Sequence, residues 1–299
     1  MPLVSFRDLM QHAEQGQYAV GYFESWNLES LQAVRDAADR LQSPVILGFS
    51  GIYLPHPSRL AKETLGMYAA LGLEACRSLS VPACLLFNES PDFDWVMDAI
   101  DLGFSLVMYT DETLGPEQQS ETVRCIVDKA HAVGVAVEGE LSSLPGVAGG
   151  LASLPGEQDL DDPDLVRAFV ERTGVDALAV NVGQVHLHGR SEVRLNLKRL
   201  EELRRIVSVP LVLHGATSIS HEDIREAIQR GIRKINVGSV LKRAYFEAVQ
   251  AACLEIGRDY NPYEVVGSGL DRDVLTAGRL AMQPKVEALM TLFGSAGRG

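Results

Sequence analysis

Short hydrophobic runs recur along the chain, and each is followed by a segment with a helical pattern. The runs are continuously apolar rather than alternating, which is typical of strands buried on both faces of a parallel sheet. Eight such runs cover residues 18–23, 44–50, 82–88, 104–109, 134–140, 175–182, 209–214 and 232–238. The pattern predicts a series of βα units.

The segments between these runs carry helical signals. Within residues 28–41, apolar side chains (Leu28, Leu31, Val34, Ala38 and Leu41) recur at spacings of three and four, which predicts one apolar helix face. Asp162 followed by Pro163 predicts a helix start, and Gly174 predicts the end of the same helix.

The spacing of the runs indicates the architecture. Their starts advance by about 31 residues per step, the size of a βα unit. We therefore predict an α/β fold, a single (β/α)8 TIM barrel, with residues 1–299 forming one domain. A doubly wound sheet is the alternative, because periodicity alone does not show closure. Residues 141–161, rich in Gly, Ser and Pro, predict a loop at the active-site end.

Charge and composition narrow the class of protein. The chain has 27 Lys and Arg against 40 Asp and Glu, a net charge of −13. This balance argues against binding to nucleic acid or to an anionic membrane. No apolar stretch approaches the roughly 18–20 residues that span a bilayer, and no signal peptide is expected at the start. The scattered cysteines predict reduced thiols in the cytoplasm.

Polar residues follow several of the predicted strands at the carboxyl end, where (β/α)8 barrels carry their active sites. Glu89, His186 and His214 lie at three of these ends. Two imidazoles and one carboxylate suit Zn²⁺, Mn²⁺ or Fe²⁺, with an open position for a substrate oxygen. The alternative is that each residue merely caps a strand. Two histidines at equivalent ends of adjacent strands favour the metal site.

A second group of residues indicates a phosphate site. Loops after the seventh and eighth strands commonly bind phosphate in this fold through backbone N–H groups and small hydroxyl residues. The candidate residues are Ser50, Gly215, Thr217, Gly238 and Ser239. The alternative is that the glycines only make tight turns. Candidate sources of positive charge are Lys242, Arg243 and Arg190.

The whole chain resembles the class II, metal-dependent ketose-bisphosphate aldolases, which include fructose- and tagatose-bisphosphate aldolases. The matching segments are YAVGYFESWNLESLQAV, SPVILGFS, RTGVDALAV, VPLVLHGATSI, GIRKINVGSVLKRAYFEAV and LFGSAGRG, of which LVLHG and KINV are the more specific. The resemblance implies a (β/α)8 barrel, one divalent metal ion and a homodimer or homotetramer. Zinc is the first expectation for the metal, with manganese, cobalt or iron as alternatives.

The resemblance also implies roles for single residues. The family's three histidine ligands fall on Glu89, His186 and His214, so one of them is changed. The aspartate that exchanges protons with the aldehyde-side oxygen falls on Asn88. The loop glutamate that serves as the proton shuttle falls on Ala148.

Other family positions are partly retained. A buried glutamate after the fifth strand is kept as Glu140, and the asparagine that contacts the dihydroxyacetone unit is kept as Asn236. Leu187 replaces a glycine beside the second histidine. Gly238 replaces an aspartate in the phosphate loop, whereas Ser239 keeps its hydroxyl.

These changes affect expected catalytic and metal-binding positions rather than positions that determine the fold. Asn88 cannot transfer a proton, and each general acid–base group contributes about 10²–10⁴ to the rate. His188 is the first candidate to replace the lost groups, because it lies near a presumed ligand and titrates near neutrality. The alternative for His188 is an exposed loop residue. Further candidates are Glu138, Glu140, Asp111 and Glu112.

We therefore expect a metal-dependent aldolase or lyase that cleaves or forms a phosphorylated keto sugar through a metal-stabilised enediolate. A sugar-phosphate isomerase or epimerase on the same scaffold is one alternative. A catalytically silent barrel that binds a phosphosugar or supports a partner is another. In each case the ligand is a small phosphorylated sugar, and neither nucleic acid nor a membrane is a partner.

Overall fold

The computed structural model describes residues 2–141, 144, 160–185 and 193–299. Most of the predicted active-site loop lies outside these residues. So do His186, His188 and Ala148, together with Leu187 and Arg190.

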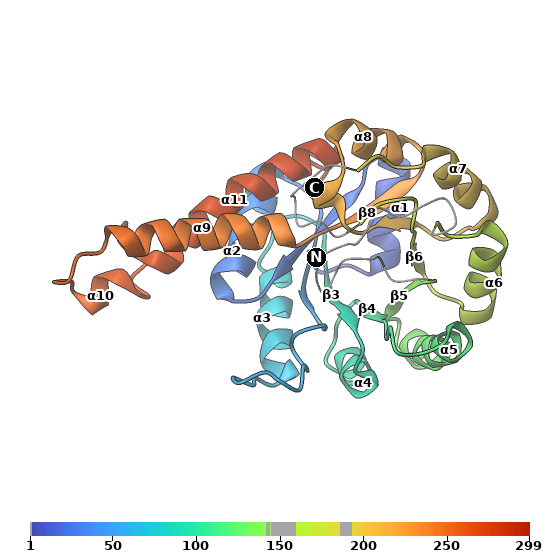
Figure 1. Cartoon of the computed structure of the whole chain (residues 1–299), viewed down its shortest axis with the longest axis horizontal. Helices are drawn as coiled ribbons and strands as arrows, with labels where there is room; N and C mark the ends of the chain where they lie inside the picture. The colour runs from blue at the N-terminus through green and yellow to red at the C-terminus, as the bar shows by residue number, and fades with distance from the viewer. Residues whose placement is uncertain (1, 142–143, 145–159, 186–192) are drawn as a thin grey trace.

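Parallel strands close into a barrel in which β1 pairs with both β2 and β8 (Figure 1). The eight strands are β1 (Val20–Ser25), β2 (Val45–Ser50), β3 (Ala83–Ser90), β4 (Leu106–Tyr109), β5 (Ala136–Glu140), β6 (Ala177–Ala179), β7 (Leu211–Leu213) and β8 (Ile232–Val237). The predicted barrel is confirmed, and closure excludes the doubly wound sheet. Strands β6 and β7 have only three residues each, so the runs predicted there were too long.

Helices surround the strands on the outside. They are α1 (Phe6–Gly16), α2 (Leu28–Leu41), α3 (Leu65–Arg77), α4 (Phe93–Asp101), α5 (Pro116–Ala132), α6 (Pro163–Thr173), α7 (Leu197–Ile206), α8 (His221–Gln229), α9 (Ser239–Glu255), α10 (Pro262–Val265) and α11 (Val274–Phe293). Asp162 caps α6 and Gly174 ends it in the left-handed conformation, as predicted. The apolar face of α2 is confirmed except at Leu28, the first residue of the helix, which is 48% exposed.

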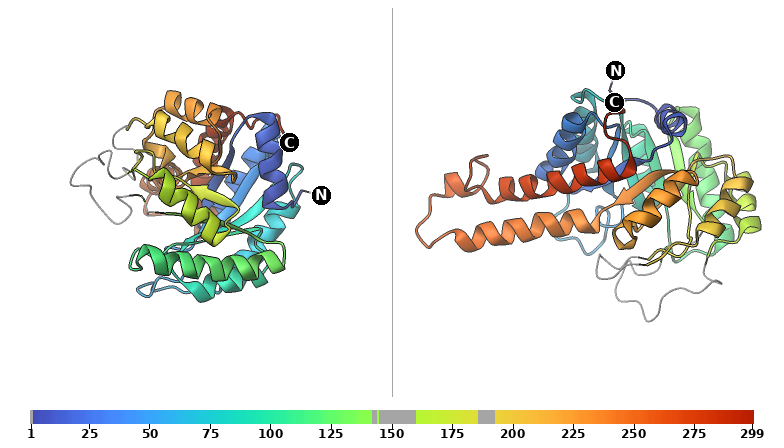
Figure 2. Two further views of the ribbon diagram at one scale, coloured as in Figure 1. Left: turned by 90° about the vertical axis from the view of Figure 1, so that its right-hand side faces the viewer. Right: turned by 90° about the horizontal axis from the view of Figure 1, so that it is seen from above.

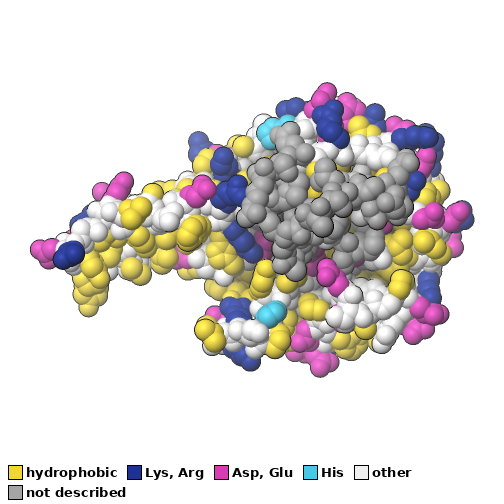
Figure 3. Space-filling model, in the orientation of Figure 1, with side chains coloured by type: hydrophobic (Ala, Val, Ile, Leu, Met, Phe, Trp, Pro, Cys, Tyr) yellow, Lys and Arg dark blue, Asp and Glu magenta, His cyan; other side chains and the backbone are white. Residues whose placement is uncertain are grey.

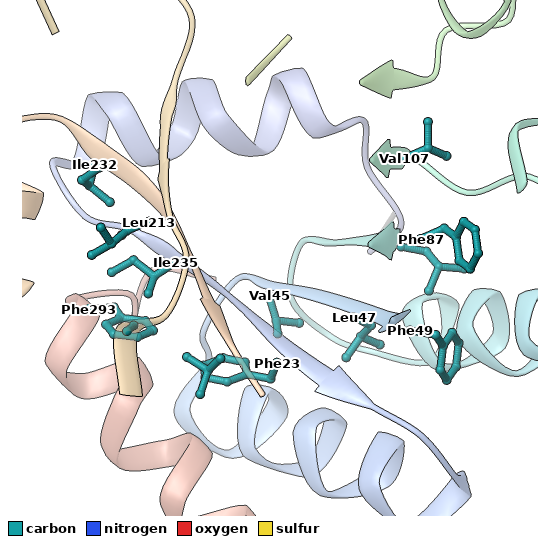
Figure 4. Packing of buried hydrophobic residues seen from close by; sticks show 14 of the residues in the cluster. Phe23, Val45, Leu47, Phe49, Phe87, Val107, Leu213, Ile232, Ile235 and Phe293 are labelled. Carbon is teal, nitrogen blue, oxygen red and sulfur yellow. The ribbon is translucent and has the colours of Figure 1, made fainter. Parts of the chain in front are cut away.

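Two hydrophobic cores result from the alternation of side chains along the strands. The outer core lies between strands and helices. Phe23 and Phe293 stack there, and Phe49 belongs to the same cluster (Figure 4). The inner core fills the barrel, and α1 closes its N-terminal end with Phe6, Leu9, Met10 and Ala13. Successive residues of a strand point to opposite faces, so every second residue faces the barrel interior.

The same alternation brings polar side chains to the barrel mouth. Along β1, Val20 and Tyr22 belong to the inner core, and Glu24 follows them at the mouth. Along β8, Lys234 is buried and Asn236 follows it at the mouth. The interior therefore changes from apolar to polar toward the carboxyl ends of the strands.

Helices α9 and α11 pack against each other and extend beyond the barrel as an arm, with α10 at its tip (Figures 1 and 2). Hydrophobic side chains show on the surface of this arm (Figure 3). The large exposed apolar residues of the arm are Phe246, Leu254, Tyr260, Tyr263, Val266, Leu270 and Leu280. Exposed apolar surface of this extent commonly marks an interaction site. Of the helices in the described ranges, none is long and apolar enough to cross a membrane.

Candidate active site

A pocket of about 180 Å³ opens at the barrel mouth, where β1, β2, β3, β7 and β8 end. Its lining includes Tyr22, Glu24, Ser50, Asn88, Glu89, His214, Gly215, Thr217, Asn236, Gly238, Ser239 and Lys242. Two of the three expected metal ligands, Glu89 and His214, thus share one cavity with residues of both expected phosphate loops.

Not all predicted site residues lie in this pocket. Glu140 is buried at the end of β5, outside the pocket lining, and the Thr110 hydroxyl donates to it at 2.5 Å. Asp111 and Glu112 follow β4 and also lie outside the lining. Arg243 does not line the pocket, whereas Lys242 does.

Glu89 reaches the pocket through an irregular backbone. The pairing of β3 with β4 shifts register between Phe87 and Ser90, and Glu89 has a φ of 50°. A positive φ is strained for a residue with a side chain, and bulges of this kind re-aim side chains near functional sites. Asn88 Nδ2 donates to Glu89 Oε2 at 2.6 Å, and Glu89 Oε1 lies 3.1 Å from His214 Nδ1.

On the Nε2 side of its ring, His214 contacts a series of buried charged side chains. His214 Nε2 lies 2.8 Å from Glu138 Oε1, and Glu138 Oε2 lies 2.7 Å from Lys234 Nζ. Burial opposes charge on the His214 ring, but Glu89 and Glu138 outweigh it and raise the His214 pKa to about 10. Burial likewise opposes charge on Glu138, but Lys234 and His214 lower its pKa. These contacts fix the ring with Nδ1 toward Glu89.

Asn236 links these buried charged side chains to Asn88 in the pocket lining. Its Oδ1 accepts from Lys234 Nζ at 2.5 Å, and its Nδ2 donates to Asn88 Oδ1 at 3.3 Å. The same Nδ2 lies 2.9 Å from His214 Nε2. The amide is therefore held in one orientation beside Asn88 and the expected metal ligand His214.

Glu89 and His214 fit a divalent metal ion. Their facing donor atoms are 3.1 Å apart, close to the ~3.3 Å that separates two ligands of a tetrahedral ion with bonds of about 2.0 Å. Within the part of the chain that the structure describes, no group of three His, Cys, Asp or Glu side chains is arranged as a metal site. The third expected ligand, His186, lies outside that part.

One end of the pocket combines two turns and a helix start. Gly215 has a φ of 66° and leads into the short 3-10 turn Ala216–Ser218. The Ser239 hydroxyl donates to Thr217 Oγ1 at 3.3 Å, and α9 begins at Ser239. Backbone N–H groups at a helix start attract anions, so this end can hold a phosphate.

Glu24 and Lys242 form an ion pair in the same cavity. Lys242 Nζ lies 2.5 Å from Glu24 Oε1 and faces the rings of Trp26 and Tyr53. Burial raises the Glu24 pKa, and Lys242 partly offsets that effect. A side chain at Gly238 would collide with the Glu24 carboxylate.

Glu24 and Tyr22 are not identified as site residues from the sequence alone. The first predicted strand was ended at residue 23, two residues before the strand itself ends. The signal was present, because Tyr22 and Glu24 are separated by the two-residue period of a strand face.

Comparisons with known proteins agree over the whole chain. The model of the family described as "Fructose-bisphosphate aldolase class-II" matches residues 4–298. A fructose-bisphosphate aldolase of Geobacillus stearothermophilus is 34% identical over 300 residues, covering 100% of this chain and 99% of that protein. One from Staphylococcus aureus is 32% identical with the same coverage. The crystal structure of the YdjI aldolase from Escherichia coli K12 is 28% identical, covers 99% of both chains and gives a TM-score of 0.78.

Proposed function

Since the chain belongs to the class II fructose-bisphosphate aldolase family, we propose that it cleaves or forms a carbon–carbon bond in a phosphorylated keto sugar at the barrel mouth. The observation that carries this proposal is the approach of Glu89 Oε1 to His214 Nδ1, 3.1 Å apart in a pocket that also holds the two candidate phosphate loops. A bound divalent ion would polarise the keto group of the substrate.

The residues of the pocket have different proposed roles in metal binding and substrate binding. Glu89, His214 and His186 are the proposed metal ligands. Asn88 holds the Glu89 carboxylate, and Asn236 offers an oriented amide to a substrate oxygen. Zinc is the first candidate, but a carboxylate ligand in place of a histidine also suits harder ions such as manganese. A manganese or iron enzyme is therefore compatible with the proposal.

We assign the phosphate to the end of the pocket formed by Gly215, Thr217, Gly238 and Ser239. Two hydroxyl groups and the start of α9 provide donors there. Lys242 is the lysine of the pocket lining, but it is already paired with Glu24. A phosphate therefore competes with Glu24 for Lys242.

The proposal is tested with dihydroxyacetone phosphate, because its enolisation is one half of the reaction and requires no knowledge of the aldehyde. We expect the metal-loaded protein to exchange a carbon-bound proton of this ketone for deuterium in D2O, as followed by NMR. Removal of the metal by a chelator should stop the exchange, and added zinc or manganese should restore it.

Absence of exchange with every added metal, together with absence of cleavage of fructose and tagatose bisphosphates, would contradict the proposal. NMR of the products also tests the type of reaction. An aldolase yields two fragments from one keto sugar, whereas an isomerase or epimerase yields a single product of unchanged mass.

We further propose that the chain forms a homodimer or homotetramer through the α9–α11 arm. Tyr263 is 86% exposed and Leu254 81% exposed on this arm. Replacing both by aspartate should convert the oligomer to a monomer in sedimentation velocity. Leu165→Asp is the matched control, because Leu165 is 60% exposed on α6, away from the arm. A monomeric parent protein, or an arm variant of unchanged size, would contradict this assignment.

A cytoplasmic location is part of the same proposal. The four cysteines, all within the described residues, are unpaired, and Cys76 and Cys84 are buried. Unpaired thiols suit a reducing compartment.

A further inference from the structure

The Tyr22 side chain has an unusual position on the pocket floor. Tyr22 lies on β1 opposite Asn236 of β8 and lines the pocket, yet its side chain belongs to the inner core and is 2% exposed. Its hydroxyl is buried and has no hydrogen-bond partner among the described residues. Buried polar groups nearly always have a partner, so this hydroxyl calls for one that the described residues do not provide.

The polar groups around Tyr22 already bond to one another. Glu138 pairs with His214 and Lys234. Asn236 contacts Lys234 and Asn88, and Glu24 pairs with Lys242. The Lys234 ammonium lies 5.4 Å from the centre of the Tyr22 ring, over its face rather than at its oxygen. None of these pairings involves the buried hydroxyl of Tyr22, a residue that lines the pocket.

The surroundings also keep the hydroxyl protonated. Burial, together with the carboxylates of Glu24, Glu89 and Glu138, raises the Tyr22 pKa well above its ordinary value. Tyr22 therefore offers a neutral O–H donor at any working pH. Carboxylates repel a developing negative charge, whereas a fixed neutral donor stabilises it.

We propose that Tyr22 is a catalytic residue of the reaction proposed above, and that its hydroxyl donates a hydrogen bond to the substrate oxygen on which negative charge develops. This assignment rests on the proposed function. Tyr22 and Asn236 are paired residues of the adjacent strands β1 and β8, so the two side chains would approach the substrate from neighbouring strands. Asn88 cannot transfer a proton to the substrate, so stabilisation of the developing charge would depend more on a neutral hydrogen-bond donor such as Tyr22.

The test is Tyr22→Phe, which removes only the hydroxyl. We expect kcat for deuterium exchange into dihydroxyacetone phosphate to fall roughly 10²-fold, the usual effect of losing one such donor. KM should change little, and the melting temperature should be equal to or higher than that of the parent, because a hydroxyl without a partner is lost.

Tyr18→Phe is the matched control. Tyr18 is also buried on the inner-core side, but its hydroxyl bonds to His12 Nδ1 at 2.7 Å, outside the pocket lining. We expect the opposite pattern there, with a lower melting temperature and unchanged exchange.

The outcomes separate this inference from the proposed function. If the parent protein exchanges deuterium and Tyr22→Phe does so equally fast, Tyr22 is not catalytic and the proposed function stands. If Tyr22→Phe loses rate and melting temperature together, the hydroxyl is structural and the inference is overturned. If the metal-loaded parent shows no exchange, the proposed function fails and this inference fails with it.

Discussion

Replacing His214 by alanine is expected to lower metal-dependent exchange of dihydroxyacetone phosphate by more than about 100-fold and to release the metal. His214 faces Glu89 through Nδ1 and Glu138 through Nε2. Loss of partners behind a metal ligand already costs 10- to 100-fold in metal affinity or activity, so loss of the ligand itself should exceed about 100-fold. The variant also leaves two carboxylates without their common partner.

The measurement combines metal content after dialysis with the exchange rate by NMR. His221→Ala is the control, because His221 is exposed at the start of α8 and lies outside the pocket lining. It should keep both metal and activity. Retention of metal and exchange by His214→Ala would rule out His214 as a ligand.

Replacing Glu138 by glutamine is expected to destabilise the fold by about 3–5 kcal/mol, because it leaves the buried Lys234 ammonium without its carboxylate. Both side chains of this ion pair are fully buried, and their charged atoms are 2.7 Å apart. The free energy of unfolding should be measured in urea. The exchange rate should also fall by about 10- to 100-fold, because Glu138 orients the His214 ring.

A double-mutant cycle with Lys234→Met isolates the pair. We expect the double variant to be less destabilised than the sum of the single variants, because it leaves no unpaired charge at this position. Single variants within about 1 kcal/mol of the parent would contradict the importance of the buried pair.

The fold was predictable because strands of a closed barrel are buried on both faces and therefore have continuously apolar sequences. The spacing of these runs indicated the barrel, and the structure added closure through β1 and β8. Lengths were less predictable. Within the run predicted at 175–182, the strand β6 covers only three residues, although Val180 N–H still donates to Val212 O of β7 and Val180 and Val182 belong to the outer core.

The pocket was predictable where a polar residue interrupts an apolar run at a strand end, as at Asn88, His214 and Asn236. Tyr22 was not predicted as a site residue, because a tyrosine within an apolar run is counted as one of the apolar residues of the strand. Lys234 escaped notice because a lysine is usually exposed, and its burial depends on Glu138 from a strand nearly a hundred residues away. The approach of Glu89 to His214 depends on a local register shift that no sequence pattern indicates.

Under the proposed function, Glu89 and His214 hold a catalytic divalent metal ion. The most direct measurement is X-ray anomalous scattering from crystals of the protein saturated with zinc or manganese, with dihydroxyacetone phosphate present. We predict one ion at the barrel mouth, bound by both Glu89 and His214. A mouth without metal, in which Glu89 remains hydrogen-bonded directly to His214, would contradict the claim.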